Sequence, residues 1–269
     1  AKPILCDISD QNLCLDAEKV LSKINKRTKA IIYVTLNGRS GDIDKIQKVC
    51  NKKKLYLIED SAHSIGSYSK NKHHGTFGIA SSFSLSMPKL ITTGQGGFVV
   101  TNNSKMFKKI KELKNFGRKT DGNDIYFSTG YNFKFTDLQS SLGLSQLNNL
   151  SYRVRQKKLI FKNYYNELKD IKEIKMFKFN KSETPWFIDI YLKNPNKLKS
   201  YLRKFNIITR NVYPPLNTLK IFNFKGSLKT SEYYCSRGLW LPSSVNLSIK
   251  DIKFITNKIK YFIKNYAKD

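Results

Sequence analysis

The loop at residues 81–97, SSFSLSMPKLITTGQGG, gathers side chains that suit covalent chemistry with an aldehyde. Lys89 stands in its middle, after a hydroxyl-rich run that includes Ser84 and Ser86, and before two threonines and a glycine-rich turn. Earlier in the chain, Asp60 ends the apolar run LYLIED. An amine, a carboxylate and hydroxyls are the groups that nucleophilic catalysis with an aldehyde cofactor uses.

Each of these residues taken alone also has an ordinary structural explanation. The 49 lysines and arginines are scattered along the whole chain, and an aspartate after a strand is often a cap or turn residue. Together the residues match the needs of pyridoxal phosphate, which requires a lysine for its aldehyde, a carboxylate for its ring nitrogen and donors for its phosphate. We therefore expect Asp60, Ser84 and Lys89 to face one pocket at the carboxyl ends of strands.

Alternating strand and helix patterns in the first half must position these residues. Strands are predicted at residues 3–8, 29–36, 55–60, 80–85 and 96–101, and those at 29–36 and 55–60 are predicted to be buried. Amphipathic patterns predict helices at residues 16–24, where Asp16 stands near the start, and at 42–54. Short connections between such elements imply a parallel sheet with right-handed crossovers.

The second half changes in character. A long helical pattern covers residues 136–171, and five apolar residues fall broadly on one face of it: Leu138, Leu142, Leu147, Leu150 and Val154. Beyond it, strands are predicted at residues 186–192 and 207–215, and helices at 195–206 and 248–266. We predict an α/β fold with a large domain at residues 1–160 and a smaller C-terminal α+β domain at residues 161–269.

Several segments, in order, resemble the DegT/DnrJ/StrS-type nucleotide-sugar aminotransferases. They are AIIYVTLNGRSGDID, LIEDSAHSIGS, FSLSMPKLITTGQGG, GYNFKFTDLQSSLGLSQL and TRNVYPPLNT. The resemblance covers nearly the whole chain. It implies the fold of the fold type I pyridoxal-phosphate transferases, with a mostly parallel central sheet in the large domain.

The resemblance also implies roles for individual residues. Lys89 would bond covalently to pyridoxal phosphate, Asp60 would meet the pyridine nitrogen, and His63 would lie beside the ring. Ser84 would bind the cofactor phosphate, and Asn132 would reach the phosphate of the partner subunit across a dimer. The stretch that resembles the family's late sugar-binding segment supplies two substrate-binding residues, Arg210 and Tyr213.

The implied activity is amino-group transfer, with glutamate as donor, to a keto sugar of a nucleoside-diphosphate sugar. The implied assembly is a homodimer with shared active sites. A sister group of the same fold has His in place of the lysine and performs dehydration, and Lys89 argues against that activity.

The chain departs from the family pattern in several places. The family's opening segment, about a quarter of a full-length member, is not matched, so the large domain is expected to be incomplete at its N-terminus and its activity reduced. Smaller departures are Gln95, where Glu is usual, Lys134, where Arg is frequent, and Asn217, where His is common. The last weakens any inference about the sugar.

The formal net charge of +29 raises a rival interpretation, a basic nucleic-acid-binding protein. The cations are scattered among apolar residues at helical spacing, which is typical of solvated helix surfaces, so no nucleic-acid or membrane partner is expected. A non-catalytic or truncated relative of the aminotransferases is the other alternative.

Cysteine and histidine usage points away from a metal site. Four cysteines, at positions 6, 14, 50 and 235, show no Cys-x-x-Cys pair and no zinc spacing, so we interpret them as packing residues in a reducing cytoplasm. His73 and His74 lie in a polar turn at residues 66–78 and are expected to face solvent.

Overall fold

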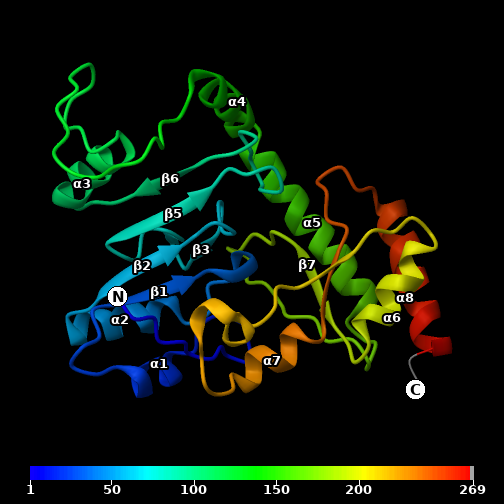
Figure 1. Ribbon diagram of the computed structural model, residues 1–269. Helices are drawn as coiled ribbons and strands as arrows, with labels where there is room; N and C mark the ends of the chain where they lie inside the picture. The colour runs from blue at the N-terminus through cyan, green and yellow to red at the C-terminus, as the bar shows by residue number, and fades with distance from the viewer. Residues whose placement is uncertain (267–269) are drawn as a thin grey trace.

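The computed structural model describes residues 1–266, in which one open sheet and one smaller sheet are flanked by helices (Figure 1). The larger sheet has the strand order β1-β2-β5-β6. Its strands are β1 (Ala30–Val34), β2 (Tyr56–Asp60), β5 (Ala80–Ser84) and β6 (Gly97–Val100). The first three are parallel, whereas β6 runs antiparallel to β5. The predicted α/β fold with a mostly parallel sheet is confirmed.

Helices α1 (Ala17–Lys23) and α2 (Ile43–Lys53) cover one face of this sheet. Helix α1 begins where the Asp16 side chain accepts hydrogen bonds from two backbone N–H groups in the first turn. The alternating side chains of the strands point into a core that these helices close. That core contains Val20, Ile31, Tyr33, Ile43, Ile46, Cys50, Leu57 and Phe77.

The opposite face of the sheet is open among residues 1–266. Ile32 is 65% exposed and Tyr56 is 58% exposed, and Val34 and Ile58 lie beside them on the same face. Parallel sheets are normally covered on both faces, because their strands are apolar on both sides. This face is therefore an uncovered apolar surface.

The smaller sheet consists of three antiparallel strands in the order β7-β9-β8. They are β7 (Ile188–Tyr191), β8 (Arg210–Asn211) and β9 (Gly238–Leu241), and the helices around them are α5 (Leu150–Leu168), α6 (Pro195–Arg203), α7 (Lys229–Cys235) and α8 (Ile249–Tyr266). Residues of β7, β9, α5, α6 and α8 share one hydrophobic core. Across residues 1–266, no helix has the length and apolar character that crossing a membrane requires.

Shorter elements complete the fold. They are the helices α3 (Ser104–Lys114) and α4 (Asp137–Asn148), the hairpin of β3 (Tyr68–Ser69) and β4 (Lys72–His73), and the 3₁₀ turns η1 (Leu36–Gly38), η2 (Leu216–Thr218) and η3 (Lys220–Phe222). The domain boundary at residue 160 stays a prediction.

A buried ion pair joins the two sheets. Arg39, in the loop after β1, donates to Asp189 of β7 at 2.7 Å, and both side chains are 2% exposed. The Tyr191 hydroxyl donates to the same carboxylate at 2.9 Å. The guanidinium carbon of Arg39 lies 4.2 Å from the ring centroid of Phe179. The loop that leaves β1 is thus fixed against β7.

Three predicted elements differ from the structure. Residues 3–8 form no strand, because within residues 1–266 their one pairing is the isolated bridge between Ile8 and Leu15. The helical pattern at residues 136–171 is divided at Asn149 into α4 and α5. Leu138 on α4 is 86% exposed, so its apolar face covers no core. Of the strand predicted at residues 207–215, only β8 at Arg210–Asn211 forms.

The expectation that His74 faces solvent is wrong. Its ring is fully buried, and Nε2 lies 2.9 Å from the Ser40 hydroxyl. His73 is half-buried. The turn around them is drawn inward because Glu59, also buried, accepts hydrogen bonds from the N–H groups of Gly75, Phe77 and Gly78. The four cysteines are free thiols, and Cys14 and Cys50 are core residues as predicted.

Candidate active site

Two neighbouring strands bring Asp60 and Ser84 to the same edge and face of the sheet. Asp60 ends β2, and its partner in the parallel ladder is Ser82, two residues before Ser84 at the end of β5. Because side chains alternate along a strand, Ser82 and Ser84 share a face with Asp60. Ser84 and Lys89 line the pocket described next, whereas Asp60 is not among its lining residues, so the expectation that all three face one pocket stays a prediction.

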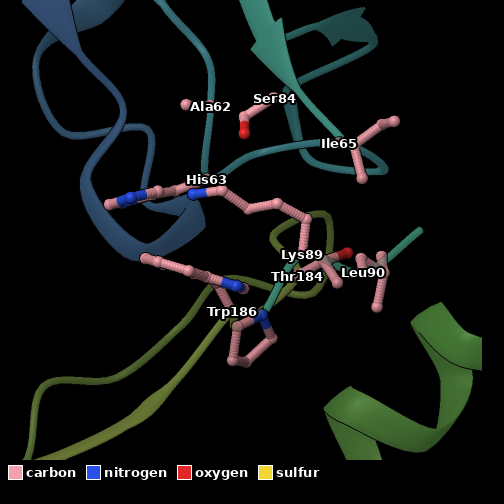
Figure 2. Close-up of a pocket in the computed structure, with 9 residues that line it drawn as sticks. Ala62, His63, Ile65, Ser84, Lys89, Leu90, Thr184 and Trp186 are labelled. Carbon is pink, nitrogen blue, oxygen red and sulfur yellow. The ribbon is translucent and has the colours of Figure 1, made fainter. Parts of the chain in front are cut away.

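A pocket opens beside these strand ends (Figure 2). Three segments line it: the turn after β2, the loop after β5, and residues 184–186 before β7. The lining residues are Ala62, His63, Ile65, Ser84, Lys89, Leu90, Thr184, Pro185 and Trp186. Figure 2 shows the Lys89 side chain extended toward His63, with the Trp186 ring below both in this view.

The loop that carries Lys89 is closed by its own backbone. The N–H of Leu85 donates to the Gly96 carbonyl, and that of Thr93 donates to the Leu85 carbonyl, each at 2.9 Å. Gly94 and Gly96 have φ values of +77° and +128°, which residues other than glycine rarely adopt. The glycine-rich turn therefore serves the backbone conformation that returns the chain to β6.

The Lys89 amine is poised for nucleophilic chemistry. Burial lowers the pKa of Lys89 to about 8, and the negative charge of Asp60 opposes this shift. A substantial share of the amine is then neutral near pH 8, in contrast to the ordinary lysines of the surface. A neutral amine is the form that attacks a carbonyl carbon.

His63 is held in one orientation and one protonation state. Its Nδ1 accepts a hydrogen bond of 3.3 Å from the Asn37 N–H, which places the ring proton on Nε2. Burial, and then the charge of Lys89, lower the pKa of His63 to about 3. The ring is therefore a neutral hydrogen-bond donor at physiological pH.

Hydroxyl groups gather next to the lysine. The Ser84 and Ser86 hydroxyl oxygens lie 3.0 Å apart, and the Ser86 N–H donates to Ser84 Oγ at 3.3 Å. Asp60 accepts the Ala62 N–H at 3.1 Å, which fixes its carboxylate at the strand end. No group of three His, Cys, Asp or Glu that could hold a metal ion occurs in the described residues.

The predicted substrate residues, Arg210 and Tyr213, are not among the residues that line the pocket, but they lie near one of them, His63. The Tyr213 ring stacks at 6.5 Å from the His63 ring, and the guanidinium carbon of Arg210 lies 5.4 Å from the Tyr213 centroid. Both Arg210 and Tyr213 are exposed, so both are accessible to a ligand. Trp240 packs edge-on against Tyr213 at 4.9 Å and supports it.

Asn132 is not brought to this pocket. It is exposed on the segment between α3 and α4, where it forms an isolated bridge with Asn115. Its expected role across a dimer stays a prediction. Of the three departures from the family pattern, Asn217 bonds to Glu232, Gln95 is exposed, and the Lys134 amine lies over the Phe116 ring.

Two residues of the site were not singled out from the sequence. Trp186 is the first residue of a predicted strand, and its ring lies 3.8 Å from that of His63. Asn37 has φ +57° and pairs its side chain with the backbone of Phe187, donating at 2.9 Å and accepting at 2.5 Å. The available signal was an Asn-Gly pair after a buried strand, which marks a special turn.

Comparison with known proteins identifies the family to which this site belongs. A profile of the DegT/DnrJ/EryC1/StrS aminotransferase family matches residues 1–260. The chain belongs to this family. The DegT/DnrJ/EryC1/StrS aminotransferases are pyridoxal-phosphate-dependent enzymes of sugar metabolism, and the expected family, enzyme class and cofactor are confirmed.

Individual relatives agree with the family assignment. The chain is 31% identical over 271 residues to a GDP-perosamine synthase of Vibrio cholerae, which covers 97% of this chain and 74% of the relative. Helicobacter pylori PseC, an aminotransferase of pseudoaminic acid biosynthesis, superposes with a TM-score of 0.90 at 27% identity, over 98% of this chain and 74% of its own. The aminotransferase TlmJ of Streptoalloteichus hindustanus shares the fold, with a TM-score of 0.92 at 23% identity.

The donor set fits pyridoxal phosphate on chemical grounds. Lys89 supplies a half-buried amine with a lowered pKa, and Asp60 supplies a carboxylate close enough to influence it. The paired hydroxyls of Ser84 and Ser86 offer donors for a phosphate, and the Nε2–H of His63 offers one for a ring oxygen.

Proposed function

We propose that this chain transfers an amino group, with glutamate as the donor, to a keto sugar carried by a nucleoside diphosphate. The observation that supports this most strongly is the Lys89 amine, placed beside the neutral ring of His63 and within electrostatic reach of Asp60. Family membership supplies the reaction class, and relatives named as GDP-perosamine synthase and PseC support the substrate class.

The residues of the site have distinct roles in this proposal. When bound, pyridoxal phosphate supplies a positively charged ring that accepts electrons from the bond broken at the substrate carbon. Asp60 would hold the proton on the ring nitrogen, and Ser84 would donate to the phosphate. His63 would donate from Nε2 and orient the ring. Lys89 Nζ would hold the cofactor and, when free, would move the proton at the substrate carbon.

The exposed surface beside the pocket suits a sugar nucleotide. Arg210 supplies a guanidinium group for the diphosphate, and the exposed ring of Tyr213 supplies an apolar face for the sugar. The net charge of +29 adds a long-range attraction for an anionic substrate. The remaining finer features of the proposal are a homodimer in which Asn132 completes the neighbouring phosphate site, and a cytoplasmic location.

The test is direct transfer of nitrogen. Protein supplied with pyridoxal phosphate and ¹⁵N-glutamate is incubated with a panel of keto sugars linked to GDP, UDP or dTDP, and the sugar products are analysed by mass spectrometry. The proposal predicts a ¹⁵N-amino sugar with at least one nucleotide, and none with Lys89→Ala. Equal labelling by wild type and Lys89→Ala would contradict the proposal, and so would the absence of ¹⁵N from every sugar of the panel.

A further inference from the structure

Trp186 contacts both functional groups at the centre of the pocket. The Lys89 amine nitrogen lies 3.7 Å from the centroid of the Trp186 ring, and the His63 ring lies 3.8 Å from it. Trp186 itself is buried, at 5% exposure. The indole face is thus the floor on which the amine and the imidazole lie side by side (Figure 2).

The Lys89 amine has no other strong contact in the described part of the chain. Among residues 1–266, Nζ donates no hydrogen bond and forms no ion pair, and Asp60 acts on it only through its charge. A lysine side chain has four rotatable bonds and therefore many conformations to choose from. A cation over an indole face is attracted to it, most strongly where water is partly excluded.

Three hydrogen bonds hold Trp186 in place. Its Nε1–H donates to the carbonyl of Pro88 at 2.8 Å, next to Lys89 in the chain. Its backbone N–H donates to the Asn37 carbonyl at 3.3 Å. Its carbonyl accepts from the buried amine of Lys157, on α5, at 2.5 Å. The ring is therefore tied to the lysine loop, to the turn that orients His63, and to the central helix.

We propose that Trp186 is a positioning residue whose indole face holds the free Lys89 amine beside His63. The inference rests on the proposed function, because it concerns the same lysine. Whenever the Lys89 amine is not bonded to the cofactor, it lies on the indole face of Trp186, beside the site of the cofactor ring. The hydrogen bond from Trp186 Nε1–H to the Pro88 carbonyl fixes the position of the indole relative to the loop that carries Lys89.

The test begins with protein that carries no cofactor. Lysines are reductively dimethylated with ¹³C-formaldehyde and cyanoborohydride, which keeps their charge, and the Lys89 resonance is assigned by its loss in Lys89→Met. The indole ring current is expected to move this resonance upfield of the surface lysines. The shift should vanish in Trp186→Leu, persist in reduced form in Trp186→Phe, and remain in Trp240→Phe.

Trp240→Phe is a matched control because it makes the same chemical change at the chain's other tryptophan. Trp240 is also buried, at 6% exposure, and lies 6.1 Å from Trp186. If Trp186→Leu does not fold, the wild-type shift and its reduction in Trp186→Phe decide the question. A wild-type Lys89 resonance at the position of the surface lysines would overturn the proposal, as would an unchanged shift in Trp186→Leu.

A second readout is the rate at which Lys89 captures pyridoxal phosphate. In this step Nζ bonds to the aldehyde carbon and the aldehyde oxygen leaves as water. The rate constant should fall in Trp186→Leu, because the amine is then no longer confined beside the ring site, and recover in part in Trp186→Phe. An unchanged rate constant in Trp186→Leu would count against the proposal.

The two hypotheses fail in different ways. Borohydride reduction of protein given pyridoxal phosphate can show whether the cofactor is attached to Lys89. If it is attached there but the Lys89 resonance of the cofactor-free protein is not shifted, Trp186 has no positioning role and the proposed function stands. A shifted resonance without any cofactor on Lys89 would overturn the proposed function, and with it the role given to Trp186.

Discussion

At the scale of single residues, environment separates Lys89 from the other lysines of this highly basic chain. Burial lowers the pKa of its amine, Asp60 opposes the shift, and the indole of Trp186 lies under the nitrogen. The many exposed lysines lack such surroundings. Chemistry at this site therefore depends on a small set of neighbours and not on the overall charge.

Asp60 offers the sharpest substitution at this scale. Asp60→Asn removes the charge that keeps the cofactor ring protonated and changes the shape of the side chain little. Transamination is expected to fall by at least about a hundredfold, while cofactor affinity changes less. Single-turnover kinetics with glutamate and a titration of the cofactor absorbance measure the two effects. Near-normal turnover in the variant would remove Asp60 from its role.

Residue-level inference from the sequence succeeded where a residue followed a recognisable element. Asp60 and Ser84 were predicted at strand ends because LYLIED and ASSFSL are short segments of strand length. Trp186 was not identified, since one tryptophan at the start of a predicted strand does not reveal which loop it will meet. His74 was misassigned because the polar turn around it is drawn inward by the buried Glu59. The N–H of Gly75 in that turn donates to Glu59, which lies 16 residues earlier in the chain.

At the scale of elements, helix α5 couples the pocket to the smaller sheet through Lys157. The amine is buried, at 7% exposure, and donates to the carbonyls of Trp186 and Ser243 at 2.5 and 2.6 Å. Burial lowers the pKa of Lys157 to about 8. The loop that carries Trp186 and the loop after β9 are thus held by one buried cation.

This geometry predicts how stability depends on pH. In the unfolded chain Lys157 has the ordinary lysine pKa of about 10.4, so between that pH and about 8 the unfolded state binds more protons than the folded state. Stability from this group must then rise with pH in that window, by up to about 1.4 kcal/mol per unit. In urea unfolding at pH 7, 8, 9 and 10, the free energy of unfolding of the wild type should rise relative to that of Lys157→Met as the pH increases.

The comparison with Lys157→Met isolates one group, because Lys89, whose pKa is also lowered, is present in both proteins. Two stability curves that stay parallel from pH 7 to pH 10 would contradict the buried, charged state of Lys157.

Elements with strong periodicity were the ones the sequence predicted well. Helices α2 and α8 and strands β1, β2 and β5 lie within the expected ranges. Strand β9, of four residues, and helix α7, of seven, were not predicted. Residues 3–8 have the composition of a strand, but a strand requires a partner, and in residues 1–266 only the bridge between Ile8 and Leu15 forms there.

At the scale of the whole molecule, the open face of the larger sheet dominates the expected behaviour in solution. Ile32, Val34, Tyr56 and Ile58 form a continuous apolar surface on β1 and β2. Contiguous exposed apolar surface of this kind binds hydrophobic molecules and other protein surfaces. The face also leads to Asp60, so it adjoins the candidate active site.

The 269-residue chain is therefore expected to bind a hydrophobic fluorescent dye and to self-associate with increasing concentration. The double variant Ile32→Thr/Ile58→Thr should lower both effects. Ile221→Thr is the matched control, because Ile221 is 86% exposed but lies far along the chain in η3. Dye fluorescence and light scattering measure the outcome. Equal reductions in the double variant and the control would mean that the open face is not the source.

The central claim is that Lys89, among all the lysines of this chain, bonds to pyridoxal phosphate. The measurement is borohydride reduction of protein given a substoichiometric amount of pyridoxal phosphate, followed by peptide mapping. The account predicts one dominant pyridoxyl peptide that contains Lys89, present in Asp60→Asn and absent in Lys89→Arg. Label spread over surface lysines, or concentrated on a different lysine, would contradict the account.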